Sequence, residues 1–199
     1  MISTQEKLMQ CVVKSVAELG FENASIKTIA QRAGLSTSTV YCHYASKEEM
    51  FEATFMYLAG IFCRFYSSDL SGLVGQSKEE SCHNLWNHYV KFFLSYDDAV
   101  LFYIRYRHSA YYNNDIRHQV ETYEASYFKS TQSIADHMGL SNENGGAAAV
   151  LRFFVEAVLL YTEQLVSGKA MPIHNELAFK AVYAAMMAIE ASYNDYIKQ

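Results

Sequence analysis

Proline and glycine are scarce in this chain of 199 residues, which has one proline, Pro172, and nine glycines. Because these residues mark most tight turns, their scarcity argues against a protein built from short strands and hairpins. It favours helices, and we expect an all-α fold. The chain also lacks a secretion-type opening and any run of about 18 apolar residues that could form a membrane helix. We therefore expect a cytoplasmic protein that has no membrane partner.

Neither paired cysteines nor a dominant charge is present. The four cysteines, Cys11, Cys42, Cys63 and Cys82, have no metal-type spacing, and the absence of a secretion signal favours reduced thiols. The net charge is −5, yet residues 1–50 hold five Lys/Arg against five Glu, so all of the excess acid lies in residues 51–199. An acidic body with a neutral head is compatible with nucleic-acid binding through the head, because a contact surface responds to local charge.

Capping residues and glycines divide the first part of the chain into four expected helices. The first begins at the capping box Ser3-x-x-Glu6 and ends at Leu19-Gly20, with Leu8, Val12, Val16 and Leu19 on its inner face. Ser25 caps a second helix that ends at Gly34, and Ser36 caps a third from Thr37 to about His43. A long fourth helix runs from about Lys47 to Tyr66. Further helices are expected at about 78–95, 97–110, 115–138, 144–167 and 174–197, which makes about nine in all.

The segment Ser25–Lys47 has the pattern of a helix-turn-helix. Two short helices joined by Ala33-Gly34-Leu35 set the second helix across the first, so that its outer face can enter a major groove. That outer face carries Thr37, Ser38 and Thr39, whose short side chains let the backbone approach base edges closely. Val40 and Tyr44 fall on the opposite side, and we expect both in the core.

Residues 30–50, AQRAGLSTSTVYCHYASKEEM, resemble the N-terminal signature of the TetR family of bacterial repressors, approximately A-x-x-A-G-V-S-x-G-T-L-Y-x-Y-F-x-S-K-E-x-L. The apolar, glycine, tyrosine and lysine positions coincide in register over about a quarter of the chain. The departures are Ser38 in place of glycine, His43-Tyr44 in place of Tyr-Phe, and Cys42 where a polar or basic residue is common. The resemblance implies an all-α protein with a three-helix DNA-binding domain at residues 1–47 and a ligand-binding and dimerisation domain at 48–199.

The resemblance also implies roles for residues of the first domain. Lys27 and Thr28 would contact phosphates, and Thr37, Ser38 and Thr39 are the candidates for base contacts. Tyr41, His43 and Lys47 would hold the DNA backbone. Together with the cap residue Ser36, these residues form the predicted DNA-binding set, and the expected partner is a palindromic double-stranded operator.

For residues 48–199 the resemblance implies a homodimer and a small-molecule effector but supplies no motif. Small residues recur on one face of the last helix, and an apolar set at similar spacing lies on the helix before it. The predicted dimer interface comprises Phe154, Val158, Tyr161, Ala181, Ala185, Ala188 and Ser192. Aromatic rings with polar tips suit a pocket for a flat or apolar ligand. The predicted effector site comprises Trp86, Tyr89, Phe93, Tyr103, Tyr106, Tyr127 and Glu156.

The interpretation is a DNA-binding transcription regulator, by the family's habit a repressor that a small molecule releases from its operator. We expect neither an enzyme nor a bound cofactor or metal, because phosphate-binding glycine loops and nucleophile or zinc motifs are missing. Cys82, His83 and His88 fall on different sides of a helix. A metal-responsive regulator, a thiol-responsive regulator acting through Cys42, an all-helical enzyme, and a helical scaffold protein without DNA binding stay open as alternatives.

Overall fold

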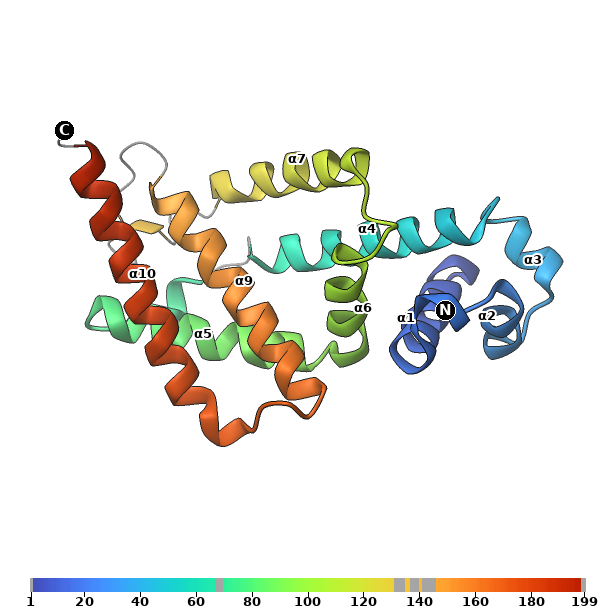
Figure 1. Ribbon diagram of the computed structural model, residues 1–199, viewed down its shortest axis with the longest axis horizontal. Coiled ribbons are helices and arrows are strands. Elements are labelled where there is room, and N and C mark those ends of the chain that lie inside the picture. Colours follow the sequence, from blue (N-terminus) through green and yellow to red (C-terminus); the bar gives the residue numbers. More distant parts are fainter. Residues whose placement is uncertain (1, 67–69, 131–134, 137–139, 141–145, 198–199) are drawn as a thin grey trace. The chain divides into compact units, whose positions relative to one another are not determined.

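The computed structural model describes residues 2–66, 70–130, 135–136, 140 and 146–197, apart from the side chains of 71, 125–130 and 193–197. These residues form an all-α protein, as predicted, with no strand among them (Figure 1). The α-helices are α1 (Thr4–Asn23), α2 (Ile26–Ala33), α3 (Thr37–Tyr41), α4 (Lys47–Tyr66), α5 (Lys78–Leu94), α6 (Asp97–Arg107), α7 (Asn114–Ser130), α9 (Gly146–Val166) and α10 (Asn175–Ile197). Two short 3₁₀ turns that the sequence pattern did not predict, η1 (Ser71–Leu73) and η3 (Pro172–His174), precede α5 and α10. Among the described helices, none has the length and apolar character needed to span a bilayer.

Serine caps fix where the first helices begin. The Ser3 side chain accepts a hydrogen bond from the Glu6 backbone N–H, and the Glu6 carboxylate accepts one from the Ser3 N–H, which is the predicted capping box. Ser25 and Ser36 cap α2 and α3 in the same way, each accepting from the backbone N–H three residues later. Gly34 ends α2 in the left-handed conformation, with φ 65° and ψ 34°. The expected starts of α2 and α3 and the end of α2 at Gly34 are therefore confirmed, whereas α3 ends at Tyr41, two residues before its expected end.

Helix α1 is broken near its end by Gly20, whose φ of 75° and ψ of 166° lie outside the helical region. The sequence predicted that the helix would stop here, but the chain continues in helical form to Asn23. The side chain of Leu19, just before the break, is 41% exposed. The placement of Leu19 on the inner face was therefore wrong, whereas Leu8, Val12 and Val16 are fully buried as expected.

The chain forms two compact units. Unit 1 comprises Met1–Cys63 and Asp98–Tyr123, and so holds α1, α2, α3, most of α4, α6 and the start of α7. Its core is strongly aromatic, because Phe21, just after the break in α1, contacts Phe51, Phe102, Tyr106 and Tyr111 with ring centroids 5.3–6.0 Å apart. The helix-turn-helix thus packs as part of a larger body that includes α4 and α6.

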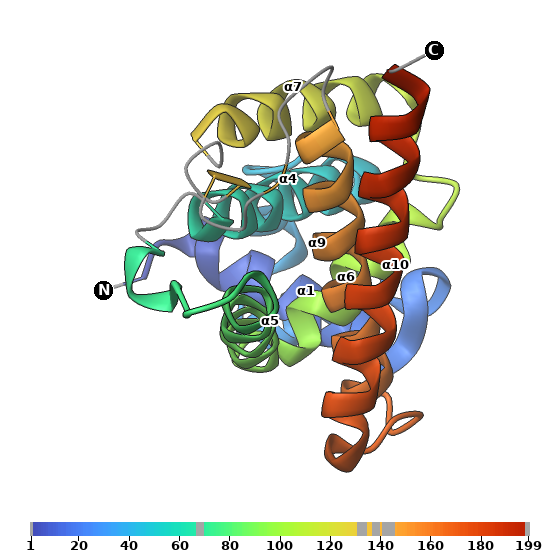
Figure 2. The same cartoon turned by 90° about the vertical axis from the view of Figure 1, so that its left-hand side faces the viewer.

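Unit 2 comprises Arg64–Asp97 and Glu124–Gln199. Helices α9 and α10 run side by side in both views, and α5 packs against both of them (Figures 1 and 2). Trp86 of α5 is fully buried, and its indole N–H donates a 2.8 Å hydrogen bond to Asn175 at the start of α10. Lys78 of α5 pairs with Glu190 of α10 at 2.5 Å. These two contacts hold α5 and α10 in register over several turns.

The break in α1 generates a stability prediction. At Gly20 a side chain would meet no atom within 4 Å, so Gly20→Ala tests the backbone conformation alone. An L-residue is strained at φ 75° and ψ 166°, and the free energy of unfolding should fall by about 1–3 kcal/mol. Gly72→Ala is the matched control, because Gly72 is equally uncrowded but has no positive φ. Chemical denaturation of both variants provides the measurement, and equal stabilities would contradict the prediction.

Candidate nucleic-acid interface

The outer face of α3 carries the predicted base-contacting side chains. Thr37 and Ser38 are exposed and Thr39 is half-buried, whereas Val40 is fully buried on the other side. Tyr44 is only 4% exposed, as predicted for a core residue. α3 packs on α2. The buried residues of α2 are Ile29, Ala30 and Ala33. The buried residues hold α3 in place, and its hydroxyl-bearing face is left open to solvent.

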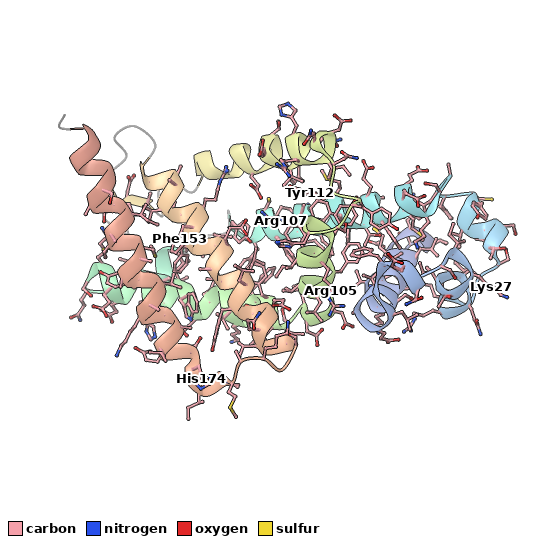
Figure 3. The ribbon with its side chains drawn as sticks, in the orientation of Figure 1. Lys27, Arg105, Arg107, Tyr112, Phe153 and His174 are labelled. Carbon is pink, nitrogen blue, oxygen red and sulfur yellow. The ribbon has the colours of Figure 1, made fainter. Side chains whose placement is uncertain are left out.

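The predicted phosphate-contacting residues lie around this face. Lys27 is exposed at the start of α2, and Figure 3 shows its side chain pointing away from the helices. Tyr41 is 57% exposed and His43 is half-buried. Thr28 is half-buried, and its hydroxyl lies 2.8 Å from that of the cap residue Ser25, which fixes the orientation of its side chain.

Lys47 has a role within the protein that the motif did not indicate. Its ammonium donates a 2.7 Å hydrogen bond to the backbone carbonyl of Phe21 and a longer one, 3.5 Å, to that of Glu22. It also lies 5.3 Å from the centroid of the Phe51 ring, within the range of a cation–π contact. Lys47 therefore holds the end of α1 against α4, and its contact with DNA phosphate stays a prediction.

Arg105 of α6 makes contacts with α1 that the sequence analysis did not predict. Its guanidinium donates hydrogen bonds of 3.1 Å to the carbonyl of Ala17 and 3.4 Å to that of Val16, both in the last regular turn of α1 (Figure 3). The break at Gly20 interrupts the helical hydrogen bonding here, so these carbonyls benefit from an outside donor. The Leu19-Gly20 stop was the only signal in the sequence that such a donor is needed.

The hydroxyls of the first turn of α3 share one centre. Besides capping Thr39 N–H, the Ser36 oxygen lies 2.7 Å from the Ser38 hydroxyl and 2.8 Å from the Thr39 hydroxyl. Two of the three predicted base-contacting side chains are thus oriented by the cap residue itself.

The predicted effector residues are divided between the two units. Trp86, Tyr89 and Phe93 lie in unit 2, and each is at most 2% exposed. Tyr103 and Tyr106 belong instead to unit 1, where both stack on Phe55. Glu156 of α9 is half-buried, and the side chain of Tyr127 lies outside the described residues.

A further tyrosine adjoins the rings of unit 2. The Tyr161 ring lies 5.3 Å from Trp86, and its hydroxyl is buried with no hydrogen-bond partner among the described residues. Tyr89, which is 2% exposed, has a phenol pKa raised well above its usual range by burial. The Tyr161 ring thus packs on an aromatic neighbour, whereas its hydroxyl has no partner among the described residues.

The predicted dimer residues fall into two groups. Phe154, Val158 and Tyr161 of α9 are buried within the protomer, where Phe154 and Tyr161 pack against Trp86. Their place at a dimer interface stays a prediction, and on the same helix Leu160 is 49% exposed. The α10 group is at the surface: Ala181, Ala188 and Ser192 are exposed, and Ala185 is half-buried.

The cysteines and the possible metal ligands bear on the two alternative regulators. No cluster of three or more His, Cys, Asp or Glu side chains suited to a metal ion occurs among the described residues. Burial raises the pKa of the Cys82 thiol to about 12 and also raises that of Cys11, so both are protonated near neutral pH. Cys42, by contrast, is exposed at the end of α3.

Comparison with known proteins agrees with this geometry. Residues 13–54 match the model of the bacterial regulatory proteins of the tetR family. No curated protein matches the sequence. Among solved structures, a TetR family transcription regulator from Marinobacter aquaeolei VT8 is similar with a TM-score of 0.68 and 23% identity, covering 92% of this chain and 94% of that one.

Two further structures show the same fold over nearly the whole chain. The transcriptional regulator FadR from Bacillus subtilis, solved in complex with stearoyl-CoA, has a TM-score of 0.63 and 13% identity, covering 89% of this chain and 96% of its own. A TetR-family regulator from Mesorhizobium loti has a TM-score of 0.64 and 17% identity, covering 94% and 96%. A helix-turn-helix that matches the family model over residues 13–54 and a fold shared along nearly the whole chain lead to one conclusion: the protein carries a TetR-type helix-turn-helix within the all-α fold of TetR-family transcription regulators.

Proposed function

We propose that this regulator is a repressor that binds a palindromic operator as a homodimer and leaves it when a small-molecule effector binds. The observation that carries DNA binding is the exposed hydroxyl face of α3, held outward by the buried Val40 and Tyr44. A helix presented in this way fits the major groove, which is about 12 Å wide. Two such helices at a spacing of about 34–36 Å, or a multiple of it, would meet successive grooves on one side of the duplex.

The predicted DNA-binding residues take two kinds of role in this proposal. Thr37, Ser38 and Thr39 contact base edges and determine sequence preference. Lys27, Thr28, Tyr41 and His43 contact phosphates and determine position. Lys47 contributes in part through the carbonyl of Phe21, so Lys47→Ala would alter folding as well as DNA contact and is a poor test of the latter.

Lys27 offers a cleaner test of the phosphate contact. Lys27→Ala should weaken binding to all duplexes alike and reduce the slope of log K against log salt by about 0.9, because one fewer counterion is released. Fluorescence anisotropy with the DNA upstream of the protein's own gene, at four salt concentrations, gives the measurement. The matched control is Lys91→Ala, which changes an exposed lysine of α5 and should leave the slope as it is. A changed sequence preference with an unchanged slope would contradict the assignment.

A homodimer formed by α9 and α10 is supported by exposed apolar side chains in that part of unit 2. Leu160 and Leu177 are 49% and 69% exposed, and Ala181 and Ala184 lie on the surface of α10 at helical spacing after Leu177. Small side chains let a second helix approach closely, and burying the two leucines would remove apolar area from water. One helix-turn-helix makes few contacts, so a dimer would also supply the second half-site.

The dimer proposal predicts that Ala184→Arg gives monomers, because a long cation would have to be buried against the partner's apolar helix. Operator affinity should fall by at least tenfold, since each monomer engages one half-site. Sedimentation velocity and anisotropy are the two measurements. Gln119→Arg, the same new side chain at an exposed site on α7, should remain dimeric. Dimers of normal mass for Ala184→Arg would show that α10 is not at the interface.

The effector site is proposed at the aromatic cluster of unit 2, formed by Trp86, Tyr89, Phe154 and Tyr161. Its support is the buried Tyr161 hydroxyl, a polar group without a partner among the described residues, on a ring that packs against Trp86. FadR, which has the same fold, holds stearoyl-CoA, a ligand with a long apolar chain. An effector that is mainly apolar and carries one hydrogen-bonding group would match the cluster of this chain.

The state of Tyr161 can be tested without knowing the effector. A buried hydroxyl that lacks a partner costs about 1–3 kcal/mol, so Tyr161→Phe should raise the free energy of unfolding by about 1 kcal/mol. Tyr57→Phe is the control, because Tyr57 is 40% exposed and its hydroxyl can reach water. Urea denaturation of the two variants makes the comparison. A lower stability for Tyr161→Phe would mean that the hydroxyl has a partner in solution and would remove the support for the site.

Release from DNA is proposed to act through α4, which begins beside the DNA-binding residues and continues without a break from unit 1 into unit 2. An effector that weakens DNA binding must itself bind more weakly to the DNA complex by the same coupling free energy, typically about 1–3 kcal/mol. Calorimetric titration of an effector with and without operator DNA measures that coupling. Equal affinities in the two titrations would rule out release by this route.

A further inference from the structure

The first turn of α3 contains a hydrogen-bond arrangement with a consequence for base recognition. The Ser36 oxygen accepts the Thr39 backbone N–H at 3.1 Å and contacts the Ser38 and Thr39 hydroxyls at 2.7 and 2.8 Å. These two hydroxyls have no other partner in the part of the chain that the structure describes. They are also two of the three side chains assigned to base contacts, so their hydrogen-bonding capacity matters for sequence preference.

Counting donors and acceptors restricts what the two hydroxyls can offer outward. A hydroxyl has one proton and two lone pairs. One lone pair of Ser36 is used by the Thr39 N–H, which leaves one lone pair and one proton for its two hydroxyl neighbours. Ser36 must therefore accept from one neighbour and donate to the other.

The hydroxyl that donates to Ser36 uses its proton in that hydrogen bond, so it can only accept hydrogen bonds from other groups. The neighbour that accepts from Ser36 keeps its proton and can still donate. Either assignment is possible, but in both of them Ser38 and Thr39 present opposite characters, one an acceptor and one a donor. Two outward donors at the same time would require a hydrogen bond to Ser36 to break.

We propose that Ser36 is a positioning residue that couples Ser38 and Thr39, so that the pair selects adenine and rejects guanine at one position of each half-site. This inference rests on the proposed binding of DNA through α3. In the major groove adenine presents a donor, N6–H, beside an acceptor, N7, whereas guanine presents two acceptors, O6 and N7. The coupled hydroxyls match the adenine edge and leave one guanine acceptor without a donor. Both hydroxyls lie within a hydrogen bond of the same oxygen, so they are neighbours in the first turn of α3, and the proposal assigns them to one base edge.

The size of the preference follows from the loss of one of two paired contacts. A good bidentate pair discriminates by about 1–3 kcal/mol, and we expect about a tenfold preference for adenine over guanine, near the lower end of that range. The dependence of the preference on both hydroxyls is a sharper prediction than the size of the preference. A single hydroxyl on its own can bind either purine equally well.

The experiment selects bound sequences from a pool of randomised 30-base-pair duplexes with the full-length protein, followed by affinity measurements on adenine and guanine versions of the best site. Ser38→Ala and Thr39→Val each remove one hydroxyl, and either one alone should abolish the adenine preference at one shared position. The double variant should show no further loss. Stepwise losses that add up, or losses at two different positions, would overturn the coupling.

Ser36 itself provides the decisive pair of variants. Ser36→Gly removes the shared oxygen but keeps both reading hydroxyls, and glycine costs a helix cap only a few tenths of a kcal/mol relative to serine. Its adenine-to-guanine ratio should fall from about tenfold to about one, by a gain of guanine sites rather than a loss of adenine sites. Ser36→Thr retains the hydroxyl and should retain the ratio. A Ser36→Gly protein that still prefers adenine tenfold would overturn the proposal.

The outcomes separate this inference from the function on which it rests. If the wild-type protein enriches no sequence from the pool, the proposed DNA-binding role fails. If it enriches a site whose preference ignores Ser36, the proposed role survives and the coupling fails. Thermal unfolding of each variant, which should stay within a few degrees of wild type, confirms that the protein tested is folded.

Discussion

The satisfaction of backbone carbonyls at the end of α1 is the constraint on which unit 1 depends. A helix that breaks as α1 does at Gly20 leaves carbonyls that need donors from outside the helix. Two cations from other helices supply them, Arg105 of α6 to Ala17 and Lys47 of α4 to Phe21. Phe21 is held at the same place by aromatic contacts with α4 and α6. The helix-turn-helix is therefore fastened to α4 and α6 by its own first helix.

This fastening explains why the compact unit is larger than the motif. The sequence motif ends near Lys47, and a division at residues 1–47 and 48–199 follows from it. Packing continues past that point, because Phe51 and Phe55 of α4 form one aromatic core with Phe102 and Tyr106 of α6. The predicted division thus remains a proposal about function, in which the first part reads DNA and the second binds an effector and a second subunit.

The sequence predicted the features that local chemistry determines. The serine caps, Gly34 in the left-handed region and the buried Tyr44 each depend on a few adjacent residues, and all are observed. The side of α9 that faces the protomer's own core was not predictable, because Phe154 and Val158 fit either a dimer interface or a core by spacing alone. The contact of Lys47 with Phe21 was also hidden, since it joins residues 26 positions apart. Whether a side chain meets its own chain or a partner depends on tertiary packing, which periodicity does not contain.

The charge of the DNA-binding head bears on how recognition must work. Of its five basic residues, Arg32 is engaged with the Glu18 carboxylate and Lys47 with a backbone carbonyl. Few cations remain to neutralise phosphates, so the electrostatic, sequence-independent part of the affinity is small for each head. Under the proposed function, affinity then has to come from the hydroxyls of α3 and from joining two heads. The same proposal implies weak binding to non-specific DNA, which would raise the ratio of specific to non-specific binding even at a modest absolute affinity.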